Sequence, residues 1–298
     1  MMGTRSSINN KVCVITGANS GIGKETTKGL AALGAKLVMI TRDKTKGESV
    51  RDELVKHTGN PNIVLMQCDL SSMLQVKHLS EELASEYDHI DVLVNNAGAV
   101  FAKRTITPEG LECSFAVNYL APMYLTHLVL PLLLVGAPSR VINLTSGLYK
   151  QGMIRFDDLQ SEIRYDGMKA YSNAKLMVLL WTYHLAKLLK DSEVSVNAVQ
   201  PGFAATNLGR NSGSFVQEVM FCAVRFMQTT ASKAAETPVY LASSPDVEGV
   251  TGMCFAKKKP VKTSLASYDE EKQRNLYKIS LEILKIESEF VERDATSS

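Results

Sequence analysis

Residues 11–23 read Lys-Val-Cys-Val-Ile-Thr-Gly-Ala-Asn-Ser-Gly-Ile-Gly, and a helical segment follows to about Gly34. The apolar, β-branched run from Lys11 to Thr16 is typical of a strand buried on both faces. The glycines let the backbone approach a ligand closely, and the N-terminus of the next helix offers free N–H groups to an anion. An ordinary tight turn is the alternative. Strand, turn and helix together favour a phosphate site for a nucleotide.

Apolar runs and helical periodicity alternate along the rest of the chain, with short connections. Further strands are expected at residues 36–41, 63–67, 90–94, 140–144, 194–199 and 252–255, and helices at 44–57, 71–87, 108–134, 168–190, 231–242 and 269–292. This alternation predicts an α/β fold, a doubly wound Rossmann-type domain whose parallel sheet of about seven strands has helices on both faces. No linker composition divides the chain. We therefore expect one domain over residues 1–298, with a core of about 11–255 and a C-terminal tail and helix of about 256–298.

Composition and charge exclude several classes of protein. The chain has 33 basic and 31 acidic residues, so it has no general attraction for nucleic acid. Its 5 cysteines lack the paired spacing of a metal site, and Cys13, Cys68 and Cys254 lie in apolar runs, as reduced core thiols do. The first residues have no apolar stretch of a signal peptide or anchor, and prolines interrupt the apolar run 117–135. We expect a soluble, cytoplasmic protein without a metal or a transmembrane segment.

Polar residues follow the expected strands, at the sheet edge where such folds bind ligands. The second strand ends in Thr41-Arg42, with no acid before Asp43. A neutral residue followed by arginine suits a 2′-phosphate, which favours NADP(H) over NAD(H) as cofactor, while a solvent-exposed arginine is the alternative. Asp69 follows the third strand, Asn95-Asn96-Ala97-Gly98 the fourth and Ser146 the fifth.

Tyr171-Ser-Asn-Ala-Lys175 lies in the expected helix 168–190. Residues four apart share a helix face, so the tyrosine hydroxyl should lie beside the ammonium. An adjacent positive charge stabilises the phenolate, and we therefore expect the pKa of Tyr171 to fall from about 10 towards neutrality. A group poised there can exchange a proton with a substrate oxygen. Taken alone, the pair is more typical of an edge aromatic and a solvated lysine on an amphipathic helix.

These motifs, in this order and spacing, closely resemble the short-chain dehydrogenase/reductase family over about residues 11–255. The resemblance implies a catalytic set of Asn118, Ser146, Tyr171 and Lys175, in which Asn118 holds a water that relays protons and Lys175 also binds the nicotinamide ribose. It implies cofactor contacts from Gly17, Asn19, Ser20, Gly21, Ile22, Gly23, Arg42, Asp69, Leu70, Asn96, Ala97, Gly98, Tyr171, Lys175, Pro201, Gly202 and Thr206.

Within the family, the glycine turn, Thr41-Arg42-Asp43, Phe156-Asp157-Asp158-Leu159 and the C-terminal tail resemble the retinol dehydrogenase-like branch. This implies an NADP(H)-dependent enzyme that interconverts a lipophilic alcohol and its aldehyde or ketone. Many members carry an N-terminal membrane anchor, which we do not expect here, and this leaves a microsomal location and a retinoid preference open. The alternatives are a catalytically silent NADP(H)-binding scaffold, a sugar-nucleotide epimerase or dehydratase, and a lipid binder at the membrane surface.

Three further segments allow two interpretations each. The segment 203–228 is rich in Phe, Met and Val, and forms either a packed surface helix or a mobile lid over a lipophilic substrate. The lysines at 257–259 favour a solvated loop over peripheral membrane contact. Family members often form homodimers through the helices that bear Asn118 and Tyr171, and the apolar content of these helices fits a homodimer as well as it fits burial in the core.

Overall fold

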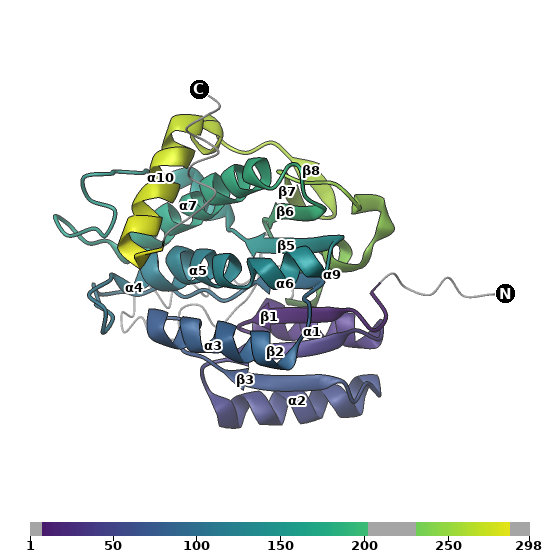
Figure 1. Cartoon of the computed structure of the whole chain (residues 1–298). Helices are drawn as coiled ribbons and strands as arrows, with labels where there is room; N and C mark the ends of the chain where they lie inside the picture. Colours follow the sequence, from purple (N-terminus) through teal and green to yellow (C-terminus); the bar gives the residue numbers. More distant parts are fainter. Residues whose placement is uncertain (1–7, 202–230, 287–298) are drawn as a thin grey trace.

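The described residues form one eight-stranded sheet in the order β3-β2-β1-β4-β5-β6-β7-β8 (Figure 1). The computed structural model describes residues 8–201 and 231–286. Its strands are β1 (Val12–Thr16), β2 (Lys36–Thr41), β3 (Ile63–Gln67), β4 (Val92–Asn95), β5 (Ser139–Leu144), β6 (Val194–Val199), β7 (Cys254–Ala256) and β8 (Lys259–Val261). Strands β1 to β7 pair in parallel, and β8 pairs antiparallel with β7. The strand order reverses between β1 and β4, which makes the carboxyl ends of these two strands the expected place for a ligand.

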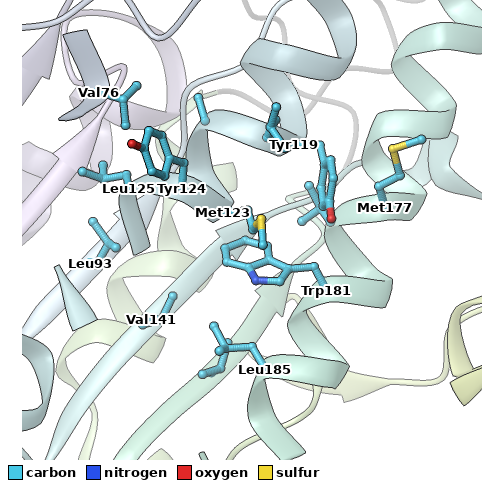
Figure 2. Close-up of a cluster of buried hydrophobic side chains, with 14 of the residues drawn as sticks. Val76, Leu93, Tyr119, Met123, Tyr124, Leu125, Val141, Met177, Trp181 and Leu185 are labelled. Carbon is cyan, nitrogen blue, oxygen red and sulfur yellow. The ribbon is translucent and has the colours of Figure 1, made fainter. Parts of the chain in front are cut away.

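Helices cover both faces of the sheet. The α-helices are α1 (Gly21–Ala32), α2 (Lys44–Thr58), α3 (Met73–Glu86), α4 (Cys113–Phe115), α5 (Ala121–Leu128), α6 (Leu130–Val135), α7 (Gly167–Leu188), α9 (Ala231–Ser243) and α10 (Glu270–Leu284); the π-helix is η1 (Ala116–Leu120), and the 3-10 helices are η2 (Gly147–Gln151), η4 (Pro245–Val247) and η5 (Leu265–Tyr268). One core cluster joins the sheet to α3, α5, α7 and α10, and the other joins it to α1, α2 and α9. Figure 2 shows part of the first cluster, where Met123 and Trp181 lie among aliphatic side chains. The predicted doubly wound Rossmann-type domain is confirmed.

The eighth strand was not expected. Lys257 and Lys258 of the cluster 257–259 are exposed, as the interpretation as a solvated loop requires, and they form the tight turn between β7 and β8, whereas Lys259 begins β8. Lys257 and Lys258 adopt left-handed φ angles of 51° and 62°, as a two-residue turn of this hairpin type requires. Lys258 also pairs with Glu236 of α9 at 2.9 Å. The turn residues are lysines rather than the usual Asn-Gly, which explains why the sequence signal for a hairpin was absent.

The predicted single helix over residues 108–134 was wrong. The helical backbone begins at Cys113, passes through the π-helix η1, and is interrupted again at Val129 between α5 and α6. Pro122 has no N–H to donate to the carbonyl four residues earlier, and the amide of Ala121 reaches back five residues to Ala116. Asn118 lies inside this wider turn. In the part of the chain that the structure describes, no helix is long and apolar enough to cross a membrane.

The C-terminal helix α10 is docked into the first core rather than lying loose on the surface. Its residues Leu276 and Leu281 belong to the same buried cluster as α7. The Tyr119 hydroxyl on η1 and the Ser280 hydroxyl on α10 share a buried hydrogen bond of 2.8 Å. The Ser280 hydroxyl also donates to the carbonyl of Leu276 at 2.7 Å. Through Tyr119, α10 supports the turn that carries Asn118.

This arrangement predicts an asymmetry between two substitutions. Ser280→Ala leaves the Tyr119 hydroxyl buried without a partner and should lower the free energy of unfolding by about 1–3 kcal/mol. Tyr119→Phe leaves Ser280 bonded to Leu276, so its cost should be about 1 kcal/mol or less. Urea unfolding of both variants measures the difference. A larger loss in Tyr119→Phe than in Ser280→Ala would contradict this account.

Candidate active site

The glycine turn after β1 leaves the N-terminus of α1 open. Gly17 and Gly21 have positive φ angles of 65° and 53°, which glycine adopts without strain. Ser20 occupies the N-cap position of α1 but makes no side-chain capping bond, so the first amides of this helix have no cap from Ser20. A Cβ at Gly23 would lie 2.3 Å from the carbonyl oxygen of Gly17. The turn is therefore tightly folded, and its backbone N–H groups can donate hydrogen bonds to a bound anion.

The motif after β4 braces this turn. The Asn96 side-chain amide donates to the carbonyls of Thr16 and Gly17 at 2.8 and 3.2 Å. The Thr16 hydroxyl accepts the backbone N–H groups of Asn96 and Ala97, both at 3.0 Å. The sequence did not single out Thr16, because its partners lie 80 residues away. Gly98 completes the motif, since a Cβ there would lie 2.9 Å from the Asn118 side-chain oxygen and 3.3 Å from the Lys175 nitrogen.

The ends of β2 and β3 carry the residues expected near the adenosine. Arg42 is exposed, whereas the Asp43 carboxylate caps α2 by accepting the N–H of Lys46 at 3.0 Å. Within residues 8–201 and 231–286, no ion pair of the Arg42 guanidinium is recorded. The half-buried Asp69 accepts the backbone N–H and the hydroxyl of Ser71 at 2.9 and 2.8 Å. Leu70 beside it is buried.

The Asn118 side chain is held by hydrogen bonds with three backbone groups. Its side-chain amide donates to the carbonyls of Ala99 at 2.8 Å and Ser114 at 3.0 Å. Its oxygen accepts the N–H of Ala99 at 2.9 Å. The bond to Ser114 satisfies a carbonyl four residues back, next to the start of the π-helix, where the regular backbone ladder is interrupted.

Ser146, Tyr171 and Lys175 meet at the carboxyl end of β5. Tyr171 and Lys175 are 5 % and 3 % exposed, and Ser146 makes a hydrogen bond with the Tyr171 hydroxyl. The Lys175 ammonium donates to the Leu144 carbonyl at 2.9 Å and lies 5.6 Å from the centre of the Tyr171 ring. The Thr145 hydroxyl donates to the Lys175 carbonyl at 2.8 Å, which ties α7 to the end of the strand. The cluster of a hydroxyl, a phenol and an ammonium therefore lies at the strand edge that also bears the glycine turn.

The expected fall in the pKa of Tyr171 was wrong for the protein by itself. Burial raises the pKa of the Tyr171 hydroxyl to about 12, and the hydrogen bond with Ser146 offsets this only in part. Burial also lowers the pKa of Lys175 to about 8. The ammonium lies over the face of the ring rather than against the hydroxyl, so desolvation outweighs its charge. Spacing along the helix predicted the neighbourhood of the two groups but not this balance.

The remaining predicted residues lie at the same edge or outside the described chain. Asn19 and Ser20 are half-buried in the glycine turn, and Ile22 is buried behind it. Pro201 follows β6 and is half-buried. Gly202, Thr206 and the segment 203–228 lie outside the described residues. The sequence also missed Asp166, whose carboxylate caps α7 by accepting the N–H groups of Met168 and Lys169. An aspartate just before a helix is a start signal that could have been used.

Comparison with known proteins agrees with this geometry. Residues 11–216 match the family described as short chain dehydrogenase. Retinol dehydrogenase 14 of Mus musculus is 39 % identical over 282 residues, which cover 91 % of this chain and 84 % of the relative. The crystal structure of an uncharacterised protein from Mycobacterium paratuberculosis aligns with a TM-score of 0.77 at 28 % identity, covering 95 % of this chain and 97 % of that one.

A further structural relative comes from Beutenbergia cavernae and is described as an NAD(P)-dependent gluconate 5-dehydrogenase with NADP bound at low occupancy. It aligns with a TM-score of 0.67 at 25 % identity, covering 84 % of this chain and 96 % of that one. The fold, the ordered motifs and these similarities lead to one conclusion: the chain belongs to the short-chain dehydrogenase/reductase family, in its retinol dehydrogenase-like branch.

Proposed function

We propose that this alcohol/carbonyl oxidoreductase is NADP(H)-dependent and interconverts a lipophilic alcohol with its aldehyde or ketone, using Tyr171 as general acid and base. The observation that carries the proposal is the buried pair of Tyr171 and Lys175, bonded to Ser146 and to the Leu144 carbonyl beside the open glycine turn. Burial of a tyrosine and a lysine together costs free energy, and such costs are typical of functional sites.

The glycine turn fits a dinucleotide. A Cβ at Gly17 or Gly23 would collide with the backbone or with Asn96, while the first amides of α1 lack a cap from Ser20. In this proposal, these amides bind the pyrophosphate, Asp69 and Leu70 contact the adenine, and Asn96, Ala97 and Gly98 line the floor beside it. Lys175 holds the nicotinamide ribose. Pro201, Gly202 and Thr206 hold the carboxamide.

The proposed proton chemistry is carried by the chain's own residues. NADP(H), when bound, supplies or accepts the hydride at the carbonyl carbon. Tyr171 gives its hydroxyl proton to the carbonyl oxygen during reduction and takes it back during oxidation. A pKa of about 12 keeps this hydroxyl protonated at neutral pH, which is the form that reduction needs. Ser146 donates to the oxygen as its negative charge grows, and Asn118 holds a water that links Lys175 to solvent.

The preference for NADP(H) rests on the end of β2. One oxygen of the Asp43 carboxylate caps α2 by accepting the N–H of Lys46. The exposed Arg42 is the group next to it that suits a 2′-phosphate. The NADP in the gluconate 5-dehydrogenase relative and the name retinol dehydrogenase 14 support the cofactor and the lipophilic substrate class.

Two further expectations remain proposals. The first is a cytoplasmic location, which we propose from the sequence. A homodimer through the helices of Asn118 and Tyr171 would share this surface with α10, which packs on α7 through a His184–Tyr277 ring contact at 4.9 Å and binds η1 through Ser280. Sedimentation of the purified chain distinguishes a monomer from a dimer.

Tyr171→Phe tests the acid/base role. It should lower kcat for an aldehyde by about 10²–10⁴-fold, because the hydroxyl proton is lost while the ring still fills its site. The dissociation constant for NADPH should change little. Tyr183→Phe is the matched control, since Tyr183 is another buried tyrosine of α7 whose hydroxyl bonds Thr263 instead. Near-normal kcat in Tyr171→Phe would refute the assignment.

Arg42→Ala tests the cofactor preference. Loss of charge-assisted bonds to the 2′-phosphate should raise KM for NADPH by about 10–100-fold and leave KM for NADH unchanged. Arg51→Ala on α2 is the control, because Arg51 pairs with Asp52 at 2.8 Å. An equal change of KM for NADPH and NADH in Arg42→Ala would show that Arg42 does not bind the 2′-phosphate.

Lys175→Met tests the buried ammonium without a substrate. Because the pKa of Lys175 falls from 10.5 to about 8 on folding, the folded chain binds fewer protons than the unfolded chain between these values, and its stability rises with pH there. Methionine lacks the charge. Urea unfolding should therefore find Lys175→Met more stable than wild type at pH 7, with the gap closing as pH rises from 8 towards 10.5. Exposed Lys169→Met should show no such trend, and a variant that is less stable at every pH would contradict the account.

A further inference from the structure

Glu112 is a buried acid that the sequence did not single out. It is 1 % exposed and directly precedes α4. Its two carboxylate oxygens accept the backbone N–H groups of Ser114 at 2.7 Å and Phe115 at 2.8 Å. Among the ion pairs recorded for residues 8–201 and 231–286, none involves Glu112. Burying a carboxylate is costly even when it is hydrogen-bonded, and a surface serine or aspartate caps a helix equally well. The burial of Glu112 therefore calls for a role beyond capping.

One side of this carboxylate leads to Asn118. The Ser114 N–H is bonded to Glu112, and the Ser114 carbonyl accepts the Asn118 side-chain amide at 3.0 Å. Ser114 is thus held from both sides, at the point where the short helix α4 passes into the π-helix. If Glu112 releases Ser114, the support of the Asn118 side chain from that side is loosened.

The other side leads to the helix of Tyr171. The Tyr165 hydroxyl donates to the Phe101 carbonyl at 2.8 Å and lies 3.2 Å from a Glu112 carboxylate oxygen. The backbone N–H of Glu112 donates to the Gln160 side chain at 2.8 Å. Tyr165 directly precedes Asp166, the N-cap of α7. Glu112 therefore contacts the loop that leads into α7, the helix that carries Tyr171.

We infer that Glu112 is a positioning residue that fixes Asn118 and Tyr171 relative to each other by binding Ser114 on one side and the Gln160–Tyr165 loop on the other. The inference rests on the proposed function, because it assigns the alignment of the two proposed catalytic residues to this carboxylate. Asn118 and Tyr171 lie on separate elements, 53 residues apart in the sequence, and Glu112 binds the segments that precede both.

Glu112→Gln tests this role. Glutamine fills the same space, but its terminal NH2 cannot accept the N–H of Ser114 or Phe115, so one of these bonds is lost. A misalignment on the order of 1 Å should lower kcat by about 10–100-fold. The hydrogen bonds of Glu112 go to Ser114, Phe115, Gln160 and Tyr165 and not to the glycine turn, so the dissociation constant for NADPH should stay unchanged. The value of kcat is expressed per NADPH site counted by titration, because unfolded protein removes sites without changing kcat per site.

Tyr165→Phe and Glu109→Gln complete the experiment. Tyr165→Phe keeps the carboxylate and its two backbone donors, so α4 stays capped. It removes the contacts of the Tyr165 hydroxyl with Glu112 and Phe101 but leaves the bond from the Glu112 N–H to Gln160, so kcat per site should fall by less than in Glu112→Gln. Glu109 is a matched control three residues away, since it accepts bonds from Ser72 at 2.8 Å and Leu74 at 3.3 Å and joins α3 instead. Glu109→Gln should keep the wild-type kcat.

Two negative results are distinguishable. If the wild-type chain reduces carbonyls and both Glu112→Gln and Tyr165→Phe keep its kcat per site, the positioning role is overturned and the proposed function stands. If the wild-type chain binds NADPH but reduces no carbonyl, the proposed function fails and the positioning role fails with it. If Glu112→Gln does not fold, Tyr165→Phe decides the matter by the same measure.

Discussion

The ammonium of Lys175 lies in the protein interior, where it donates to the carbonyl of Leu144 at the carboxyl end of β5. Few positions in a protein can hold a buried positive charge, because desolvation disfavours the charged form and here lowers its pKa to about 8. The surrounding elements are built around this group. Gly98 has no side chain that would displace it, Thr145 ties its backbone to the strand, and Tyr171 covers it. The site therefore depends on one buried charge that costs free energy of folding, and such costs are common at functional sites.

The sheet could be predicted from the sequence because its strands are buried on both faces and read as continuous apolar runs. Residues 63–67 and 194–199 form strands with the predicted bounds. The prediction of one helix over 108–134 was wrong, because the helix begins only at Cys113, Pro122 interrupts the hydrogen-bond ladder next to the wider turn of Asn118, and a second interruption falls at Val129. Strand β8 was not predicted, because lysines and a proline are not typical of a strand. Its pairing with β7 depends on a turn in which two lysines adopt left-handed φ angles.

The candidate site was predictable where it depends on local patterns and unpredictable where it depends on distant partners. The local patterns are the glycine turn, the polar residues at the strand ends and the four-residue spacing of Tyr171 and Lys175. The structure brings these residues together at the carboxyl-end edge of the sheet. The brace from Thr16 to Asn96 and the links of Glu112 to Tyr165 join residues that are 80 and 53 positions apart. The pKa of Tyr171 was mispredicted for a related reason: burial is set by the whole fold, and spacing on one helix does not report it.

We propose that this member of the short-chain dehydrogenase/reductase family uses its buried pair of Tyr171 and Lys175 to reduce and oxidise lipophilic carbonyls and alcohols with NADP(H). The most direct measurement is cofactor oxidation by the purified wild-type chain against a panel of aldehydes and ketones that includes retinal, with NADPH and NADH compared in parallel and the alcohol product quantified. The account predicts one alcohol formed for each NADPH consumed, with NADPH preferred over NADH. A chain that binds NADPH yet reduces nothing on the panel would contradict it and favour a catalytically silent scaffold.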